Sequence, residues 1–342
     1  MSDLVTLGET MVLLSAPRVG RLRDMASLDL GAAGAESNVA IGVVRLGYTA
    51  SWIGRVGSDE FGALVLATLR RERVDVSTSV VDAGAPTALM VKERRIADLV
   101  RVSYYRSGLA GSRLCAGDVD ERLVAGARVL HTTGITPALG ASALGAVQRA
   151  VAIARSAGAL VSFDVNYRSA LWTPAVAAPV LREMARHADV VFAGEDELAL
   201  LDGRGATGEV GASADDGDRD RDSAGEPGRA AVGVLEAARR VSGGAGRTVV
   251  VKRGAAGATS VGPAGTFDEP AVPVVAVDPV GAGDAFVAGY LAALLDGAGE
   301  QGRLALGCRA GAFAVSVLGD FEGLPSRDDL ALLDRGAGTT IR

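Results

Sequence analysis

A glycine-rich segment lies between two carboxylates in the stretch DPVGAGDAFVAGYLAALL, which runs from Asp278 to Leu295. Gly281 and Gly283 allow the backbone to turn its N–H groups toward one point, and a helix that begins there adds the positive potential of its N-terminus. The small side chains leave room for an anionic group to approach closely. The segment Gly281–Ala282–Gly283 is therefore a candidate anion hole.

Asp284 follows this segment directly, although a carboxylate beside an anion site repels the anion. The conflict disappears if Asp284 faces a second substrate. It would then take a proton from an attacking hydroxyl while the anion hole stabilises a transferring phosphoryl group. The alternative is that Asp284 only caps the helix, which is a common role for Asp. The stretch alone supports both interpretations equally.

The elements that position these residues alternate along the chain. Apolar runs rich in β-branched residues and bounded by Gly or polar residues predict buried strands over 4–8, 50–57, 128–135, 159–168, 188–194 and 248–254. Between them, helical patterns cover 38–47, 60–74, 143–158, 179–188 and 233–243, and the helix after the GAGD sequence closes the series. Strands that alternate with helices indicate an α/β fold with parallel strands joined by crossover helices.

Three regions interrupt this alternation. Residues 9–34 and 86–108 have the pattern of antiparallel strands with polar turns, and together they could form a small separate sheet. Such a sheet would act as a lid over substrate, and its apolar outer face could pair with a second subunit in a homodimer or higher homo-oligomer. Residues 203–228 are rich in Gly, Asp and Ser, which predicts a disordered acidic insertion within one domain spanning 1–342.

Composition and missing motifs exclude several classes of protein. The 342 residues carry a net charge of −6, which argues against nucleic-acid or anionic-membrane binding, and no apolar run is long enough to span a membrane. The sequence has no G-K-[ST] and no G-x-S-x-G, and its G-x-G-x-x-G matches do not lie between a strand and a helix. Only Cys115 and Cys308 could form a disulfide, and no signal segment is recognisable, so a cytoplasmic location is expected.

The motifs identify a family resemblance. The stretch from Asp278 is similar to the second signature of the ribokinase-like (PfkB) sugar kinases, and residues 31–62, GAAGAESNVAIGVVRLGYTASWIGRVGSDEFG, resemble the first. The segments FDVNYR, GEDEL and VKRGAAGA lie between them in the family's order. The resemblance covers nearly the whole chain apart from the acidic insertion. It implies a parallel sheet sandwiched by helices, a small β-sheet lid, and phosphorylation of a sugar by ATP with Mg²⁺.

Within this family, VRVSYYRSGLAGS and FDVNYRSALW resemble segments of the 2-keto-3-deoxygluconate kinases. The residues also offer a physical argument, because Arg106 and Arg168 could present guanidinium groups to an acidic substrate. For either arginine alone, a surface salt bridge is an equal alternative. The resemblance therefore implies that a primary hydroxyl of an acidic keto-sugar is phosphorylated.

Carried over position by position, the resemblance implies three groups of site residues. The substrate site would contain Gly34, Asn38, Met90, Tyr104, Arg106, Arg168, Asp284 and Asp320. Asp284 would be the general base beside the anion hole of Gly281, Ala282 and Gly283. The nucleotide site would share that hole and add Lys252, Arg253, Gly254, Ala255, Ala256, Gly257 and Cys308. Glu197 would order Mg²⁺ through water, and a monovalent cation could bind near Asp278.

Several positions depart from the family pattern. Met90 stands where these kinases often have Tyr, Gly194 replaces the Asn of an N-x-x-E motif, and Val280 lies in the second signature beside the expected cation site. These departures keep two alternatives open. One is another ribokinase-like kinase acting on fructose, ribose or a nucleoside. The other is a catalytically weak protein that binds a sugar or nucleotide.

Overall fold

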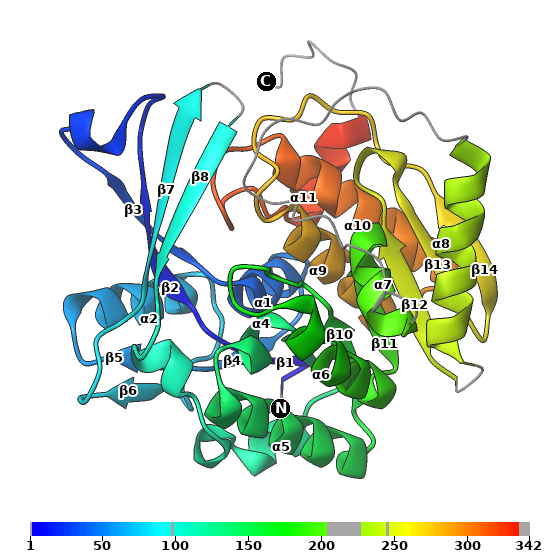
Figure 1. The fold of residues 1–342 in the computed structure, drawn as a ribbon, viewed down its shortest axis with the longest axis horizontal. Coiled ribbons are helices and arrows are strands. Elements are labelled where there is room, and N and C mark those ends of the chain that lie inside the picture. The colour runs from blue at the N-terminus through cyan, green and yellow to red at the C-terminus, as the bar shows by residue number, and fades with distance from the viewer. Residues whose placement is uncertain (1, 97–98, 204–226, 244–245, 335–342) are drawn as a thin grey trace.

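An eight-stranded sheet forms the centre of the computed structural model, which describes residues 2–96, 99–203, 227–243 and 246–334 (Figure 1). The parallel strands, in spatial order, are β4 (Ala50–Ile53), β1 (Leu4–Leu7), β9 (Val129–Thr133), β10 (Leu160–Asp164), β11 (Val190–Gly194) and β12 (Thr248–Lys252). Two antiparallel strands, β13 (Ala258–Gly262) and β14 (Gly265–Glu269), extend the sheet beyond β12.

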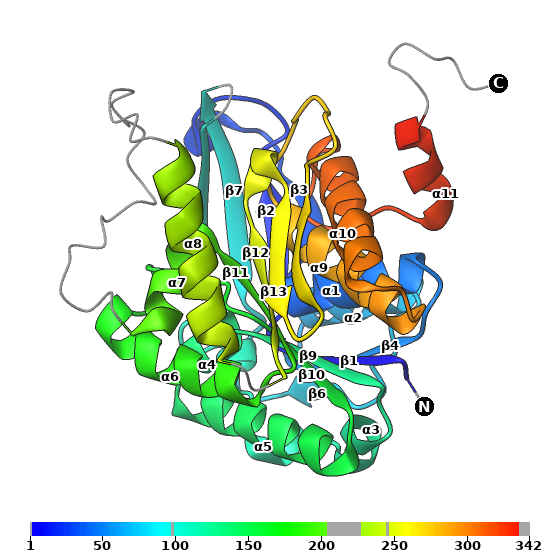
Figure 2. The same ribbon diagram turned by 90° about the vertical axis from the view of Figure 1, so that its right-hand side faces the viewer.

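Helices cover both faces of this sheet (Figure 2). One apolar core contains residues of α1 (Ala35–Arg45), α2 (Glu60–Arg71), α9 (Ala282–Leu295) and α10 (Glu300–Val315). The opposite core contains residues of α3 (Glu121–Ala125), α5 (Ala141–Ala157), α6 (Pro174–His187), α7 (Glu195–Asp202) and α8 (Pro227–Ser242). In β12, Val250 enters the first core while Val249 and Val251 enter the second. Because both faces are buried, the strand is an apolar run rather than an alternating one.

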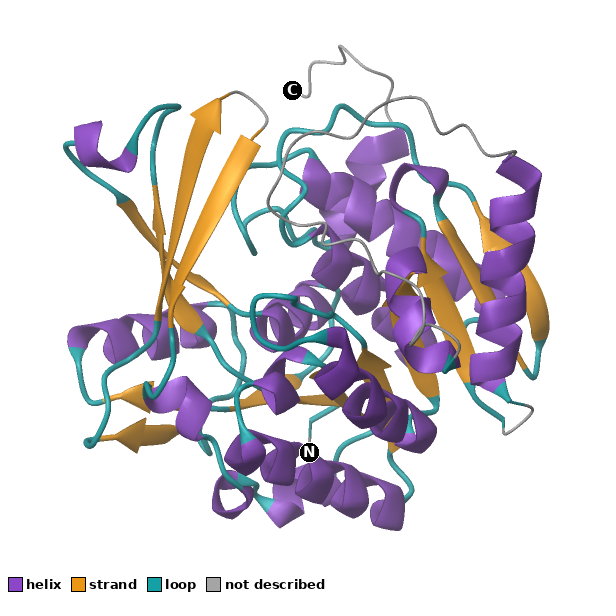
Figure 3. Ribbon diagram, viewed as in Figure 1, coloured by secondary structure: helices purple, strands orange, loops and turns teal. Residues whose placement is uncertain are grey.

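A second sheet stands apart from the main one and forms the lid (Figures 1 and 3). Its strand order is β3 (Asp29–Ala33), β2 (Met11–Ser15), β7 (Leu89–Ile96) and β8 (Leu99–Tyr105). The pairs β2–β3 and β7–β8 are antiparallel, and they join through the parallel pair β2–β7. A short two-stranded sheet, β5 (Arg55–Gly57) with β6 (Val80–Asp82), lies outside both.

The predicted fold class, a parallel sheet between helices with a small lid sheet, is confirmed. One sequence-based expectation is wrong, because the helix after the GAGD sequence does not close the series: α10 follows it, then the short α11 (Arg327–Leu330). The G-x-G-x-x-G match at 297–302 spans the loop after α9 and the first residues of α10, so it follows a helix rather than a strand.

The predicted insertion over 203–228 lies mostly outside the described residues, but Pro227 and Gly228 already belong to α8. Among the described residues, no helix is both long enough and apolar enough to cross a membrane.

Candidate active site

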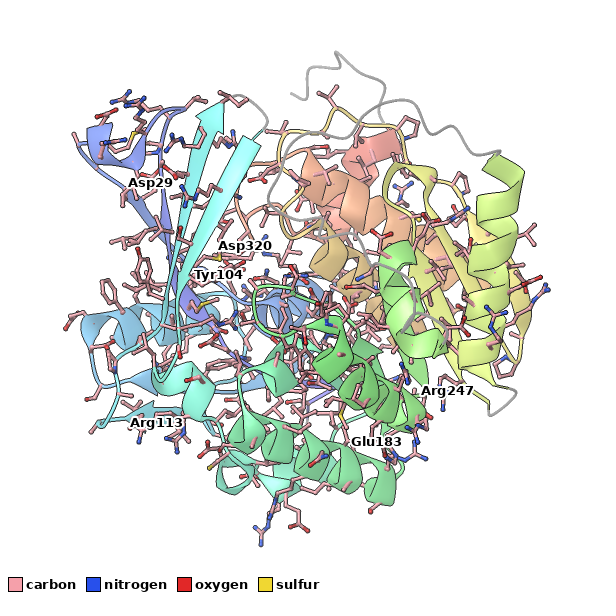
Figure 4. All side chains as sticks on the ribbon, viewed as in Figure 1. Asp29, Tyr104, Arg113, Glu183, Arg247 and Asp320 are labelled. Carbon is pink, nitrogen blue, oxygen red and sulfur yellow. The ribbon has the colours of Figure 1, made fainter. Side chains whose placement is uncertain are left out.

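A cavity of about 390 Å³ lies between the lid and the carboxyl ends of the parallel strands. Figure 4 shows side chains of both parts, among them Tyr104 of the lid and Asp320 of the main domain, around this space. The cavity brings together the predicted residues Gly34, Asn38, Met90, Tyr104, Arg106, Arg168, Glu197, Lys252, Gly281, Gly283, Asp284 and Asp320. Ligands of open α/β sheets bind at this edge, which makes the cavity the candidate active site.

Asp284 lies in the first turn of α9, where its half-buried side chain forms part of the cavity wall. The Asn38 amide donates a hydrogen bond of 2.8 Å to Asp284 Oδ2 and another of 2.8 Å to Asp320 Oδ1. Burial and the neighbouring Asp320 carboxylate raise the pKa of Asp284 to about 7. Burial also raises the pKa of Asp320, to about 6. A carboxylate with a pKa near neutrality is suited to accept a proton in a reaction at physiological pH.

The glycines before Asp284 have different roles in the fold. Gly281 caps α9 with φ +77°, and an added Cβ would collide with the Asp320 carbonyl oxygen, so this position requires glycine. At Gly283 a Cβ would lie 3.7 Å from Lys252 Nζ, which is ordinary contact distance. The free N-terminus of α9 therefore opens toward the Lys252 ammonium, and both contribute positive potential to the predicted anion hole.

Lys252, expected at the nucleotide site, ends β12 and reaches into the cavity. Its Nζ donates hydrogen bonds of 2.8 Å and 2.7 Å to the two carboxylate oxygens of Asp164, the last residue of β10. Burial alone would lower the pKa of Lys252, but Asp164 and Glu197 outweigh it and raise that pKa. Lys252 therefore remains a cation beside the anion hole at every pH in the physiological range.

Arg106, expected at the substrate site, lines the cavity and already has a carboxylate partner. Arg106 pairs with Glu9, which follows β1 and is fully buried. Its guanidinium also lies 5.5 Å from the centre of the Tyr104 ring. A second buried acid, Glu36, accepts hydrogen bonds from Thr133 and Thr136 at 2.8 Å and 2.6 Å. Any acidic substrate would thus share Arg106 with Glu9.

Arg168 has a different environment. It lines the cavity, is exposed, and donates a hydrogen bond of 3.1 Å to the Tyr167 carbonyl oxygen. Within the part of the chain that the structure describes, it forms no ion pair with a carboxylate. Of the two arginines that line the cavity, Arg168 is therefore the one whose charge is available to an anionic ligand.

Asp278, where a monovalent cation was expected, already faces two cations of the lid. Lys92 Nζ donates a hydrogen bond of 2.6 Å to Asp278 Oδ2, and an Arg94 nitrogen lies 3.5 Å from the same oxygen. The monovalent cation at this position stays a prediction, and the carboxylate is neutralised by protein groups.

The other predicted nucleotide residues lie outside the cavity. Arg253 forms an ion pair with Asp268, and residues 254–256 make the turn between β12 and β13. An added Cβ at Gly257 would collide with the Glu269 carbonyl oxygen, and Cys308 Sγ on α10 lies 3.9 Å from that same oxygen. The turn and α10 therefore meet beside the edge strand β14, and a nucleotide site there stays a prediction.

Glu197, the expected Mg²⁺ residue, has both carboxylate oxygens in use. Oε1 accepts a hydrogen bond of 2.7 Å from the Tyr167 N–H, and Oε2 accepts one of 2.7 Å from the Gly194 N–H. The described residues contain no group of three or more His, Cys, Asp or Glu side chains arranged to hold a metal ion. A metal ion bound here would need ligands from a substrate.

Sequence reasoning missed Glu9, Glu36, Asp164 and Asn166 as cavity residues. A signal existed for two of them, because Glu9 and Asp164 stand at the carboxyl ends of buried strands, where open α/β sheets bind ligands. Asn166 has a φ of +38°, which is uncommon for a residue other than glycine. This backbone conformation is visible only in the structure and not in the sequence. His131 contacts Ser162 within the sheet and does not line the cavity.

The family model described as pfkB family carbohydrate kinase matches residues 1–327. The chain belongs to this family. The pfkB kinase is similar to the 2-dehydro-3-deoxygluconokinase of Thermoproteus tenax, with 38% identity over 331 residues that cover 95% of this chain and 92% of the relative. It is also 33% identical to the 2-dehydro-3-deoxygluconokinase of Bacillus subtilis, over 96% of this chain and 94% of that protein.

The pfkB kinase also resembles solved structures. An E. coli protein described as a ribokinase II, crystallised with ATP and Mg²⁺, superposes with a TM-score of 0.80 at 25% identity, covering 98% of this chain and 99% of that one. The expectation of a sugar kinase is thus confirmed at the level of the family, and the chain is a sugar phosphotransferase.

Proposed function

We propose that this kinase transfers a phosphoryl group from ATP to a primary hydroxyl of an acidic keto-sugar, 2-keto-3-deoxygluconate (also named 2-dehydro-3-deoxygluconate). The observation that most favours an acidic substrate is the state of Arg168. This arginine is an exposed cation in the cavity and has no carboxylate partner among the described residues. A bidentate guanidinium–carboxylate contact would hold the sugar acid with its far end at Asp284. The names of the two relatives support the same substrate.

The proposed reaction uses Asp284 and the anion hole together. Asp284 takes the proton of the primary hydroxyl as its oxygen forms a bond to the γ-phosphorus of ATP. The bond from that phosphorus to the bridging oxygen breaks, and ADP leaves with the electron pair. The N–H groups at Gly281–Gly283 and the Lys252 ammonium stabilise the charge on the transferring group.

The residues present fit a nucleotide with Mg²⁺. The donor set is a helix N-terminus with an adjacent lysine for the phosphates, and Mg²⁺ usually keeps several waters and binds through one or two carboxylates plus substrate phosphates. Glu197, with Asp164 beside Lys252, would hold such waters. When bound, Mg²⁺ would neutralise phosphate charge. The turn at 253–257 and Cys308 would contact the nucleoside.

A coupled measurement of ADP release tests this proposal. Purified protein with ATP and Mg²⁺ is given 2-keto-3-deoxygluconate, fructose, ribose and a nucleoside at matched concentrations. We expect kcat/KM to be highest for the sugar acid by at least about tenfold, the factor for 1.4 kcal/mol of binding. A higher value for a neutral sugar would overturn the choice of substrate while leaving the kinase reaction in place.

A neutral-sugar kinase is the second candidate, and one observation favours it. Glu9 neutralises Arg106, and the cavity wall also holds Glu36, Asp164, Glu197 and Asp320. These carboxylates are suitable acceptors for sugar hydroxyls, which a neutral hexose offers in greater number. The same substrate series decides between the two candidates.

We also propose that the lid joins two subunits. Leu30, Ile96 and Tyr105 of the lid strands are exposed large apolar side chains, at 59%, 65% and 60%. A second copy of the chain would cover them. Light scattering of the wild type and of Tyr105→Glu tests this, with a dimer expected for the first and a monomer for the second.

A further inference from the structure

A buried ion pair joins the lid to the loop that leads into the anion hole. Lys92 lies on lid strand β7, and its Nζ is 2.6 Å from Asp278 Oδ2. The two side chains are 7% and 1% exposed. Arg94, which points to the same face of β7 two residues further on, reaches the same carboxylate oxygen at 3.5 Å. The lid therefore presents two cations to one carboxylate of the main domain.

Asp278 in turn organises the backbone around the anion hole. Its Oδ1 accepts a hydrogen bond of 3.2 Å from the Val280 N–H, one residue before Gly281. Its Oδ2 accepts a long one of 3.4 Å from the Gly319 N–H, one residue before Asp320. The Asp278 N–H itself donates to the Val315 carbonyl oxygen at 3.1 Å. One carboxylate thus links the lid cation to the segments that carry Gly281 and Asp320.

We propose that Lys92 is a positioning residue: its ion pair with Asp278 couples closure of the lid to the placement of the anion hole at Gly281–Gly283. The proposal rests on the proposed function, in which this hole holds the transferring phosphoryl group and the adjoining phosphates of the nucleotide, so that ADP affinity reports on it. It also gives Asp278 its counter-charge from within the chain. The kinase therefore needs no monovalent cation at Asp278.

The burial of the pair explains why it can transmit position. A carboxylate this deeply buried strongly favours a charged partner, so the Asp278 side chain and the backbone bonded to it follow the ammonium. When the lid moves away, Lys92 leaves with β7, and Asp278 must find another partner or admit water. The loop from 278 to 281 then loses the contact that fixes it.

The first test measures ADP affinity by calorimetry and steady-state kinetics for Lys92→Met, which keeps the length of the side chain and removes its charge. We expect ADP affinity and kcat to fall by roughly 10- to 100-fold, the factor for one charge-assisted hydrogen bond, while KM for the sugar changes only a few-fold. Lys92→Arg should keep most of both. Arg168→Leu is the matched control, which should raise KM for the sugar acid without changing ADP affinity.

Folding effects are separated by two further variants. Lys92→Met leaves the buried Asp278 carboxylate with the more distant Arg94, at 3.5 Å, as its counter-charge. Adding Asp278→Asn removes that carboxylate, so the Tm of the double variant should return toward that of the wild type while ADP affinity stays low. Lys92→Ala should regain ADP affinity and turnover with added n-propylammonium, which matches the side chain removed, and not with the same concentration of tetramethylammonium. Turnover of the wild type should be the same in potassium, sodium or choline chloride.

Three results would overturn the proposal: wild-type ADP affinity in Lys92→Met, recovery of ADP affinity in the double variant together with Tm, or a requirement of the wild type for potassium. A protein that binds ADP but phosphorylates no sugar would contradict the proposed function instead. In that case the ADP titrations of the variants still decide whether Lys92 positions the loop. A wild type that binds no ADP contradicts both.

Discussion

The carboxylates of Asp284 and Asp320 share one hydrogen-bond donor, because the Asn38 amide nitrogen lies 2.8 Å from an oxygen of each. Two carboxylates held this close repel each other when both are ionised. This repulsion adds to burial in raising the pKa of Asp284 to about 7. The raised pKa makes the Asp284 carboxylate a stronger base than an ordinary aspartate. It is therefore better suited to accept a proton from the substrate beside the helix N-terminus.

The first prediction concerns the pH dependence of turnover. A general base must be deprotonated in the free enzyme, so kcat/KM should fall as the pH drops below about 7. Asp320→Asn removes the negative charge that raises the pKa of Asp284, and the acid limb of the profile should therefore move to lower pH. Profiles of kcat/KM from pH 5 to 9 for the two proteins measure this shift. An unmoved or rising acid limb would exclude electrostatic coupling of the two acids.

The second prediction concerns stability. The pKa of Asp284 is about 7 in the folded protein against an ordinary value of 3.8, so the folded state holds this proton more tightly and loses stability as the pH rises from about 4 to 7. Asp284→Asn removes this cost, at most about 4 kcal/mol, and should raise Tm at pH 8 but not at pH 4. Asp196→Asn, on the exposed side of α7, is the control. An equal change of Tm at both pH values would contradict the assignment.

The third prediction separates the two glycines of the anion hole. Gly281→Ala places a Cβ against the Asp320 carbonyl oxygen at a positive φ, so it should lower Tm as well as turnover. Gly283→Ala meets only the Lys252 ammonium at contact distance, so Tm should stay near that of the wild type while ADP affinity falls. Thermal melts and ADP titrations of both variants check this. Wild-type ADP affinity in Gly283→Ala would place the phosphates elsewhere.

The fourth prediction compares the cavity arginines. Arg168→Leu should raise KM for the sugar acid by roughly 10- to 100-fold more than KM for fructose, because it removes a charge-assisted contact. Arg106→Leu should instead lower Tm, since it leaves Glu9 buried without its partner, at a cost of about 3–5 kcal/mol. Adding Glu9→Gln should restore much of that Tm. Equal effects of Arg168→Leu on both sugars would remove the argument for an acidic substrate.

The main sheet could be predicted from the sequence because its strands are buried on both faces. Runs such as 188–194 and 248–254 are continuous, β-branched and bounded by glycine or polar residues, and β11 and β12 follow them closely. Helix α10 was missed because Gly307 and Gly311 weaken its helical pattern. The structure gives the reason: a Cβ at Gly307 would press on Phe286, and one at Gly311 would crowd the Ala282 carbonyl oxygen. Close packing of α10 on α9 therefore requires Gly307 and Gly311, the same glycines that weaken the helical pattern of α10 in the sequence.

The candidate site was predictable where one local motif carries the chemistry and not where distant segments meet. The GAGD sequence is sufficient to place Asp284 beside a helix N-terminus. The pairs Lys92–Asp278 and Arg106–Glu9 join residues far apart in the chain, and no local pattern links their members. They depend on how the lid sits over the main sheet. For this reason the carboxylate partner of Arg106 could not be predicted from the sequence.

The turnover number of Asp284→Asn tests most directly whether Asp284 is the general base. The substitution keeps the size of the side chain and an oxygen that can accept from Asn38, but it cannot take the proton of the hydroxyl. With ATP, Mg²⁺ and the best sugar at saturation, kcat should fall by roughly 10²–10⁴-fold while ADP affinity stays within a few-fold of the wild type. A kcat near that of the wild type would contradict the account and leave Asp284 as a helix cap.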